Sequence, residues 1–392
     1  MTKSYHSLDE IRTHVTRIDN EILALLAERR QLSLEVAKSK IKTTKPVRDQ
    51  EREQALLLRL IDEGKQHQLD ANYVTQIFHT IIEDSVLFQQ AYLQKLTNPD
   101  SLQPVVRVSF LGAKGSYSNL ASRQYFSRKQ TKLVEMSCSN FRDVVNVVET
   151  GQADYGVLPI ENTSSGSINE VYDLLQHTSL SIVGEITQPI EHCLLTAVPT
   201  SLDQIDTLYS HPQPHQQCSE YLRTMGDIRQ EYTSSTADAM LQVAELQLPN
   251  VAAIGNASSG ELYGLTPLKT GIANQQENFT RFIVVARKAV DVTPLIPAKT
   301  TLIMSTGQKP GSLVECLLVL RNLNINMAKL ESRPVIGNPW EEMFYVDVET
   351  NLKSEAMQQA LEELTRLTRF IKVLGCYPSE NVKPTEVDYP EE

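Results

Sequence analysis

The sequence lacks the features that mark a membrane or secreted protein. It contains no run of about 18 apolar residues, the length that a membrane-spanning helix needs. Near Met1 there is no basic start followed by an apolar core, so we expect no signal peptide and a cytoplasmic location. The five cysteines are odd in number and scattered without a Cys-x-x-Cys pair, which argues against both a disulfide framework and a zinc site.

Positive charge is also scarce over the chain as a whole. The 392 residues carry a net charge of −11, which disfavours nucleic acid as a partner. The distribution is uneven, because the stretch from Arg12 to Arg52 contains ten basic and six acidic residues. A locally positive segment in an acidic protein suits a small anion, and a solvated helix face is the alternative interpretation.

Two proline-bearing stretches divide the chain, "TNPDSLQP" at 97–104 and "AVDVTPLIPAK" at 289–299. A chain of this length exceeds what one hydrophobic core supports. The pattern before the first stretch is helical, strands and helices alternate between the two stretches, and a short α+β pattern follows the second. We therefore predict three domains, at residues 1–98, 105–287 and 299–378.

The first segment predicts a long helix with an uncovered apolar seam. Apolar residues alternate four and three apart, as in a coiled coil, at Ile11, Val15, Ile18, Ile22, Leu25, Leu32 and Val36. The helix should run from about Ser7 to Lys42 and be on the order of 50 Å long. Helices predicted near 49–64 and 70–96 are too short to cover it, so we expect a second copy of the chain and an all-helical homodimer.

Polar and charged residues interrupt this apolar pattern. They are Arg29 and Lys40 in the seam, Ser85 and Gln89 on the third helix, and Asp49, Arg52 and Glu53 at the start of the second. Each alone is typical of a core hydrogen bond or a surface pair. Together they aim several groups inward, and a bound dianion would pair charges that are costly to bury alone. Arg12 lies about 100° around the helix from Arg29 and points elsewhere, which suits the partner chain's site.

The first segment resembles the helical chorismate mutase domain of the bifunctional chorismate mutase/prephenate dehydratase family in the stretches "LLAERRQLSLEVAKSK", "PVRDQERE" and "IIEDSVLFQQ". The resemblance implies a three-helix intertwined dimer that rearranges chorismate to prephenate without a nucleophile or proton transfer. It implies an active site made of the partner's Arg12 and of Arg29, Lys40, Asp49, Arg52, Glu53, Ser85 and Gln89. Arg12 and Arg29 would hold the substrate carboxylates. Lys40 and Gln89 would hydrogen-bond the ether oxygen as negative charge develops there. Arg52 would support the carboxylate clamp, and Glu53 would bind a ring hydroxyl.

The second segment begins with a glycine turn that imitates a dinucleotide site. The stretch "VRVSFLGAKGSYSNLA" is typical of a strand, a turn and a helix start. It offers only Gly112 and Gly115, however, where the fingerprint needs G-x-G-x-x-G. A nicotinamide cofactor is therefore not expected, and Ser116 and Ser118 are better interpreted as helix caps or as donors to a small anion.

The stretch "NFTRF" places Thr280 and Arg281 at the mouth of a β-branched strand. Thr in such a turn commonly hydrogen-bonds its own backbone, so a simple turn ending is one interpretation. Together with "GVLPIENTSSGSINEVYDLL" and "LYSHPQPHQQC", the stretch resembles the prephenate dehydratase domain of the same family, whose two α/β lobes are like a type II periplasmic binding protein. The resemblance implies Thr280 as the catalytic donor to the departing hydroxyl. It implies substrate binding by Asn162, Ser210, Gln217 and Arg281.

The third segment reads as βαββαβ, the ferredoxin-like split arrangement. Strands are predicted at 300–305, 327–335, 343–350 and 371–376, and helices at 310–323 and 355–368. The segment resembles the ACT regulatory domain of the same enzymes, because "GSLV" and "ESRP" match its two phenylalanine-binding motifs. The residues so implied are Gly311, Ser312, Leu313, Val314, Glu331, Ser332, Arg333 and Pro334. Ser312 stands where the family usually has Ala, and we expect binding to persist.

The three segments together predict a cofactor-free and metal-free enzyme, a homodimer or larger assembly, with neither nucleic acid nor membrane as partner. It would convert chorismate to prephenate and prephenate to phenylpyruvate, under inhibition by L-phenylalanine. Two alternatives stay open. A non-catalytic sensor would need an output module, and the sequence has no basic helix-turn-helix. A mutase fused to prephenate dehydrogenase would need the nicotinamide fingerprint.

Overall fold

A computed structural model describes residues 7–99, 103–127, 131–275, 277–307, 309–335 and 341–380. The chain divides into two compact units. One contains Met1–Pro99 with Thr293–Pro297, and the other contains Asp100–Val292 and Ala298–Glu380. Within the described ranges, no helix combines the length and the apolar character that crossing a membrane requires.

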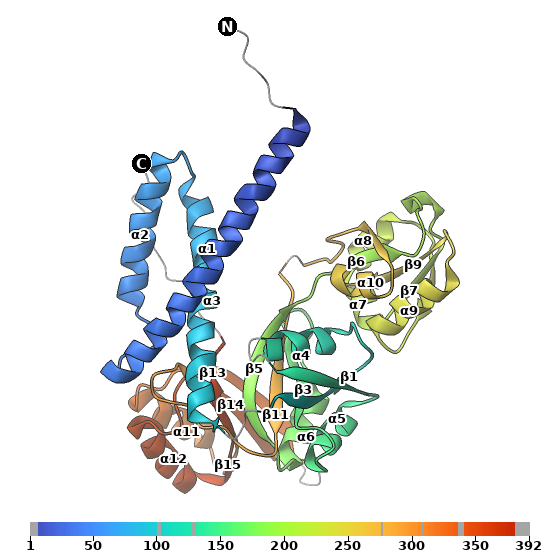
Figure 1. Ribbon diagram of the computed structural model, residues 1–392. Coiled ribbons are helices and arrows are strands. Elements are labelled where there is room, and N and C mark those ends of the chain that lie inside the picture. Colours follow the sequence, from blue (N-terminus) through green and yellow to red (C-terminus); the bar gives the residue numbers. More distant parts are fainter. Residues whose placement is uncertain are drawn as a thin grey trace. The chain divides into compact units, whose positions relative to one another are not determined.

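Three helices form the first unit: α1 (Leu8–Thr43), α2 (Gln50–Gln66) and α3 (Ala71–Thr97) (Figure 1). Each begins at a polar cap, because Ser7, Asp49 and Asp70 accept hydrogen bonds from first-turn N–H groups that have no partner inside the helix. α1 ends where Thr44 adopts a left-handed conformation with φ 53°. The predicted helix boundaries are confirmed to within two residues.

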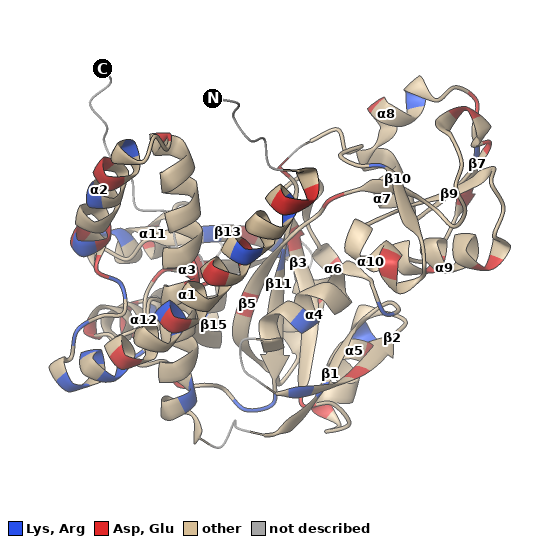
Figure 2. Cartoon of the chain, turned by 45° about the horizontal axis from the view of Figure 1, so that its top comes forward, with Lys and Arg blue, Asp and Glu red and all other residues tan. Residues whose placement is uncertain are grey.

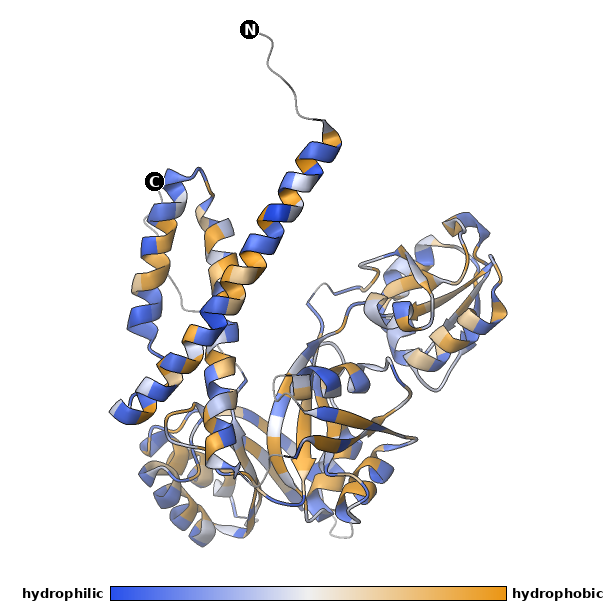
Figure 3. Cartoon of the chain, in the orientation of Figure 1, coloured by the Kyte–Doolittle hydropathy of each residue, from blue (hydrophilic) through white to orange (hydrophobic). Residues whose placement is uncertain are grey.

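α1 leaves most of its apolar surface uncovered within this chain. Of its 36 residues, only Ser33 and Ala37 are buried. Its exposed apolar side chains include Leu8, Ile11, Val15, Ile18, Ile22, Leu25 and Leu32. They recur along the helix (Figure 3), with charged residues of both signs between them (Figure 2). A bare apolar stripe of this length is typical of an interaction surface.

Part of the predicted linker at 289–299 belongs to the helical unit. The Val47 N–H, in the loop between α1 and α2, donates to the Leu295 carbonyl at 2.8 Å. Val47 itself is only 2% exposed. Residues Thr293–Pro297 therefore pack against this loop.

The second unit begins with a sheet of order β2-β1-β3-β11-β5, with β4 paired to β3. Its strands are β1 (Val105–Leu111), β2 (Lys132–Cys138), β3 (Tyr155–Asn162), β4 (Gly166–Ser167), β5 (Ser181–Pro189) and β11 (Phe279–Ala286). Its helices are α4 (Tyr117–Ser127), α5 (Phe141–Glu149) and α6 (Asn169–His177). β1 runs parallel to β2 and β3, whereas β11 runs antiparallel to β3 and β5.

A second sheet, of order β10-β6-β9-β7-β8, follows β5 along the chain. Its strands are β6 (Cys193–Thr196), β7 (Thr207–Ser210), β8 (Arg229–Tyr232), β9 (Val251–Gly255) and β10 (Thr266–Lys269). Its helices are η2 (Leu202–Gln204), α7 (Pro212–Gln217), α8 (Ser219–Thr224), α9 (Thr236–Leu246) and α10 (Ala257–Leu262). The chain crosses between the two sheets twice, from β5 to β6 and from β10 to β11, which makes two α/β lobes as expected.

β11, the strand that follows the Thr-Arg pair, is buried on both faces. Its side chains alternate, so Phe282 and Val284 pack with α4, whereas Ile283 and Val285 pack with α5 and α6. This double burial explains the continuous apolar run in the sequence. It also turns neighbouring residues of the strand toward opposite sides of the sheet.

The remaining chain forms a four-stranded antiparallel sheet of order β13-β14-β12-β15. Its elements are β12 (Ala298–Thr306), α11 (Ser312–Asn322), β13 (Met327–Pro334), β14 (Glu342–Val348), α12 (Glu355–Leu367) and β15 (Thr368–Pro378). The predicted βαββαβ arrangement is confirmed. The strand order is that of the ferredoxin-like split.

This third sheet shares a core with the first lobe and forms one unit with it. Leu374, Tyr345 and Tyr377 lie in the same buried cluster as Ile182 of β5. At Gly375 a Cβ atom would lie 2.1 Å from the Ile182 carbonyl oxygen, so the two backbones approach more closely than any larger residue allows. The second and third predicted segments are therefore packed together, which the sequence pattern does not indicate.

Candidate active sites

In the helical unit, Arg29 of α1 faces α3. Its Nη1 donates to the Ser85 hydroxyl and, at 3.2 Å, to the Ile81 carbonyl. Burial lowers the pKa of Arg29, and the nearby Asp84 acts in the opposite direction. The seam position thus places a guanidinium between the helices, beside a hydroxyl that the sequence also singled out.

Lys40 lies three helical turns further along α1, near the start of α2. Its ammonium group donates to the Val47 carbonyl. Burial is the main cause that lowers the pKa of Lys40, and Arg52 acts in the same direction. The carboxylates of Asp49 and Glu53 act in the opposite direction. The structure therefore brings these four predicted residues into one electrostatic neighbourhood.

The start of α2 is ordered by two polar contacts. Asp49 is the helix cap and accepts from the Arg52 N–H at 3.2 Å. Glu53 Oε2 lies 3.4 Å from Arg48 Nε, an ion pair whose two side chains are largely buried. Arg48 was not among the predicted site residues, and its charge was indistinguishable in sequence from the surrounding basic ones.

Gln89 lies one turn after Ser85 on α3 and is only 6% exposed. Its Oε1 has no hydrogen-bond partner among the described residues. Buried amides are nearly always paired in folded proteins, so an unpaired one is typical of a position that a ligand completes. Gln89, Ser85 and Arg29 together give the helical unit a polar interior.

Two predicted residues of the helical unit are exposed in this chain. Arg12 has a side chain 71% exposed, and its ion pair is with Asp9 at 3.7 Å. Arg52 is also exposed. Neither is brought against Arg29 here.

In the second unit, Thr280 and Asn162 meet where β11 begins and β3 ends. They are paired in register, and Asn162 Nδ2 donates to Thr280 Oγ1 at 2.9 Å. The same nitrogen lies 2.7 Å from Asn278 Oδ1. Thr280 is 8% exposed, and its hydroxyl proton has no acceptor among the residues that the structure describes. That proton is available to a bound molecule.

The oxygen of Asn162 is held by the turn between β3 and β4. It accepts from the Ser164 N–H at 3.0 Å and from the Ser165 N–H at 2.9 Å. The Ser165 hydroxyl adds a third bond at 3.0 Å. These bonds fix which end of the Asn162 amide faces Thr280.

Gln217 is oriented by a histidine that the sequence analysis did not single out. His192 Nε2 lies 2.8 Å from Gln217 Oε1 and must donate, because that oxygen only accepts. His192 is 1% exposed, and burial lowers its pKa, which favours the neutral ring. Tyr117 lies 3.2 Å from Nδ1 on its other side. Gln217 Nε2 then points to Asn162 Oδ1 at 3.5 Å.

Two further polar residues, Ser210 of β7 and Gln188 of β5, lie at or near strand ends. Ser210 ends β7 and is 1% exposed, just before His211, which caps α7. Gln188 of β5 is in register with Thr280 of β11, and its buried Oε1 has no partner among the described residues. Period-two alternation along β5 is the only sequence signal that could have indicated Gln188.

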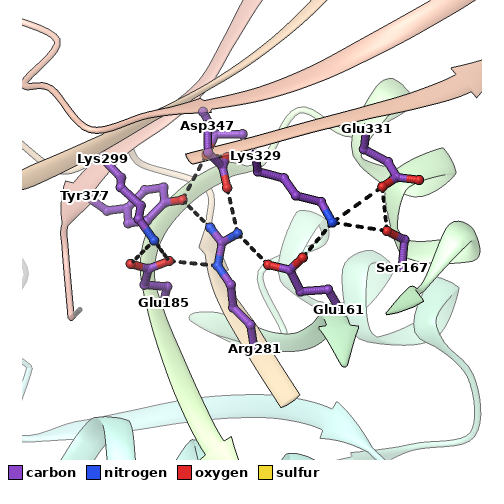
Figure 4. Close-up of polar contacts among 10 residues, drawn as sticks. Glu161, Ser167, Glu185, Arg281, Lys299, Lys329, Glu331, Asp347 and Tyr377 are labelled. Atoms are coloured by element: carbon purple, nitrogen blue, oxygen red, sulfur yellow. Dashed lines mark hydrogen bonds and ion pairs between the residues drawn. The ribbon is translucent and has the colours of Figure 1, made fainter. Parts of the chain in front are cut away.

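Arg281 pairs with carboxylates of the protein on the side of β11 away from Thr280. Alternation along β11 turns it to the face opposite Thr280, where it pairs with Glu161, Glu185 and Asp347 (Figure 4). Its side chain is 12% exposed. Three carboxylates of the protein already pair with Arg281, so the structure gives no support to the prediction that it binds a substrate carboxylate.

The two predicted regulatory motifs lie on the third sheet. Gly311 precedes α11 with φ 87°, a conformation that favours glycine, and Ser312 is buried and bonds the Lys309 carbonyl at 2.9 Å. Because side chains alternate along β13, Glu331 and Arg333 face the side of the strand opposite Ser332 and Pro334. Glu331 accepts from Ser167 at 2.6 Å and Arg333 binds Asp173 through two bonds, so both side chains contact the first lobe.

Ser332 and Pro334 face the other side of β13. Ser332 is in register with Phe344, which packs in the core beneath α11 together with Leu313. The "ESRP" strand is therefore two-faced. One face turns toward the helix that begins with "GSLV", and the other carries two charged side chains to the first lobe.

Comparison with known proteins matches both units. Residues 11–90 match the family described as chorismate mutase type II, and residues 108–290 match prephenate dehydratase. A bifunctional chorismate mutase/prephenate dehydratase from Enterobacter agglomerans is 59% identical over 376 residues, which cover 96% of this chain and 97% of that protein.

Two solved structures resemble the second unit. Prephenate dehydratase from Arthrobacter aurescens, in complex with L-Phe, has a TM-score of 0.64 and 26% identity over 72% of this chain and 93% of that one. GqqA, described as a novel type of quorum quenching acylase, has a TM-score of 0.63 and 30% identity over 70% of this chain and 98% of that one. With both domain types matched in order and a full-length relative of 59% identity, the chain belongs to the bifunctional chorismate mutase/prephenate dehydratase family.

Proposed function

We propose that the chain rearranges chorismate to prephenate in its helical unit and converts prephenate to phenylpyruvate, carbon dioxide and water in its second unit, with no cofactor. Family membership along nearly the whole chain is the observation that carries both activities. The domain limits that we propose are residues 1–98, 105–287 and 299–378.

The mutase reaction needs a fixed substrate conformation and a charge near the breaking C–O bond. Arg29, oriented by Ser85, would bind one carboxylate, and Arg12 of a second copy would bind the other. Lys40 and Gln89 would donate to the ether oxygen, where negative charge develops. Asp49, Arg52 and Glu53 would complete the wall of the site. Gln89 would donate through its amide nitrogen, and its unpaired amide oxygen could accept from a substrate hydroxyl.

A second copy of the chain is part of this proposal. The exposed apolar side chains of α1 form a stripe that a matching α1 would cover, as in a coiled coil. Such pairing would bring Arg12 near Arg29 of the other chain. We propose an intertwined homodimer or a larger assembly built on it.

The dehydratase reaction breaks the bond from the ring to its carboxylate and the bond from the ring to its hydroxyl. The electron pair of the first bond completes the aromatic ring as the hydroxyl departs. Thr280 would donate to that leaving oxygen. Asn162, which donates to Thr280 Oγ1, strengthens it as a donor. Asn162, Ser210 and Gln217 would bind substrate between two lobes that close like a type II periplasmic binding protein.

The third sheet would serve as an ACT domain that binds L-phenylalanine and inhibits the dehydratase. The Arthrobacter aurescens relative with bound L-Phe supports this assignment. The binding residues that we propose are Gly311, Ser312, Leu313, Val314, Glu331, Ser332, Arg333 and Pro334. For Glu331 and Arg333 the contribution would come from their backbone, since their side chains contact the first lobe.

One assay tests the two activities together. Purified protein is supplied with chorismate and no added cofactor, and phenylpyruvate is followed with time. We expect prephenate to rise transiently and phenylpyruvate to accumulate. Consumption of chorismate that stops at prephenate would contradict the dehydratase assignment, and stable chorismate with active conversion of supplied prephenate would contradict the mutase assignment.

A further inference from the structure

The hydrogen bonds and the ion pair of Arg281 with Asp347 form a closed ring (Figure 4). Its Nη2 donates to the Tyr377 hydroxyl at 3.1 Å, and its Nη1 lies 2.6 Å from Asp347 Oδ2. Thr301 donates to Asp347 Oδ1 at 2.6 Å, because a carboxylate only accepts. The Tyr377 hydroxyl, 2.9 Å from Thr301 Oγ1, must then donate to it. Every bond in the ring has one direction, which fixes the orientation of the guanidinium.

Two lysines extend this ring between the first lobe and the third sheet. Lys299 Nζ lies 2.8 Å from Glu185 Oε1, while Arg281 donates to Oε2 of the same carboxylate at 2.8 Å. Lys329 Nζ lies 2.7 Å from Glu161 Oε2, and Arg281 donates to Oε1 at 3.1 Å. Strands β3, β5 and β11 are thereby tied to β12, β13, β14 and β15 through largely buried charges.

The same strands carry the proposed dehydratase site. Thr280 precedes Arg281 on β11, and Glu161 precedes Asn162 on β3. Both pairs are in register across the two strands, Thr280 with Asn162 and Arg281 with Glu161. One stretch of backbone therefore presents the site on one face and the ion pairs on the other. A tilt of either strand moves both.

β13, which contains the "ESRP" motif, also contacts the strands that carry the proposed site. Glu331 accepts from Ser167 at 2.6 Å and lies 3.5 Å from Lys329 Nζ. Ser167 pairs with Glu161 across β3 and β4. Ser167 also follows, by two residues, the Ser165 that holds the Asn162 oxygen. A shift of β13 thus acts directly on the turn that orients Asn162.

We propose that Arg281, Asp347 and Glu161 are positioning residues for the dehydratase reaction. From the opposite face of the sheet they hold Thr280 and Asn162 in register, and they carry movement of the third sheet to the site. The proposal rests on the dehydratase function assigned above to Thr280.

Burial makes this network sensitive to small movements. Arg281 is 12% exposed and Asp347 is 8% exposed. Burial alone would lower the pKa of Arg281, but Asp347, Tyr377 and the neighbouring carboxylates raise it well above its ordinary value. If Asp347 moves, Arg281 must follow or lose a partner that water does not replace. A shift of about 1 Å at a reacting group can cost on the order of 100-fold in rate.

The decisive test compares two ion pairs between the first lobe and the third sheet. Asp347→Asn removes the charge that faces Arg281. Asp173→Asn removes the charge that faces Arg333, a pair carried by α6 and β13 without a residue of β3 or β11. Both variants are made in the full-length chain. Dehydratase kcat and KM are measured without phenylalanine, and mutase activity reports on intact protein.

We expect Asp347→Asn to lower dehydratase kcat at least tenfold with KM changed less than twofold. Asp173→Asn should leave both constants within twofold of the parent. Arg281→Lys, which keeps the charge but loses the planar fork, should retain part of the kcat that Arg281→Met loses. A contact that merely joins the two parts would not separate kcat from KM in this way.

Lys329→Met provides a second variant if Asp347→Asn does not fold, because Lys329 is partly exposed at 24%. We expect it to lower kcat with little effect on KM, and to bind L-phenylalanine in calorimetry with weakened inhibition. Equal effects of Asp347→Asn and Asp173→Asn would overturn the proposal, as would normal kcat and normal inhibition in Lys329→Met. Normal turnover of Thr280→Ala would instead refute the dehydratase site itself, so the two failures are distinguishable.

Discussion

At the scale of single residues, the proposed dehydratase site depends on the direction of a few hydrogen bonds. Asn162 donates to Thr280, which leaves the threonine proton for a ligand. Asn162 can do so because Ser164 and Ser165 occupy its oxygen. In the second lobe, His192 likewise occupies the side-chain oxygen of Gln217. The site therefore orients weak donors instead of relying on a strong acid.

Replacing the hydroxyl of Thr280 tests this arrangement. Thr280→Ala should lower dehydratase kcat by about 100-fold or more, because the donor to the leaving oxygen is lost. Thr280→Ser keeps a hydroxyl and should retain more activity. Prephenate should accumulate from chorismate in the Ala variant, because the mutase unit is separate. If the Ala and Ser variants have equal kcat, the hydroxyl is not the catalytic group.

The pH dependence of the mutase follows from Lys40. Burial lowers its pKa from the ordinary value, so the folded protein loses this proton at a lower pH than a free lysine does. In the role proposed for Lys40 the cation is the active form, so mutase kcat/KM should fall on the alkaline side below pH 10.5. In Lys40→Arg the alkaline fall should move to higher pH, whatever the activity that remains. An unchanged alkaline limb in that variant would show that another group titrates.

The sequence predicts some site residues and misses others for physical reasons. Helical periodicity fixes which side of α1 a residue faces, so Arg29 and Lys40 can be found from spacing alone. Period two shows that Thr280 and Arg281 face opposite sides of β11, but not which side holds the site. His192 lies 75 residues from Tyr117 and meets it only after the lobes fold. No local pattern marks such a contact.

At the scale of elements, the backbones of β5 and β15 approach too closely for a side chain. A Cβ at Gly375 would lie 2.1 Å from the Ile182 oxygen, and backbone atoms cannot yield as a flexible side chain does. The βαββαβ order is predictable from strand and helix periodicity. The packing of its fourth strand on β5 is not, because the shared core consists of apolar residues that would suit either sheet alone.

Gly375→Ala should destabilise this junction by about 1 to 3 kcal/mol, the usual cost of overpacking. Gly307→Ala is the matched control, because its nearest contact is Ser312 Oγ at 3.5 Å. Thermal unfolding of the two full-length variants measures the difference, with mutase activity recorded alongside. Equal midpoints for both variants would mean that β15 shifts away from β5 without cost.

At the scale of the whole molecule, the exposed stripe on α1 and the exposed Arg12 point to an incomplete mutase site in a single chain. Ile22→Glu places a charge in that stripe, where the side chain is 50% exposed. It should weaken self-association and lower mutase activity while dehydratase activity persists. Leu241→Glu is the control, since Leu241 lies on α9 and is 41% exposed. Sedimentation measures self-association, and the two enzyme assays measure the activities. Unchanged mutase activity in a dissociated Ile22→Glu protein would exclude a contribution of the partner chain to the mutase site.

The third sheet is part of the dehydratase body and not an appended module, which changes what its removal should do. A chain that ends at Pro297 keeps the helical unit with Thr293–Pro297 but uncovers Ile182 and leaves Glu185 without Lys299. Glu185 then keeps only Arg281, and the loss of this ion pair together with the uncovered apolar core should destabilise the first lobe. The truncated chain should therefore still convert chorismate to prephenate, while phenylpyruvate formation is lost or survives only at low temperature. Full phenylpyruvate formation by the truncated chain would show that the first lobe holds Thr280 and Asn162 in place without help from the third sheet.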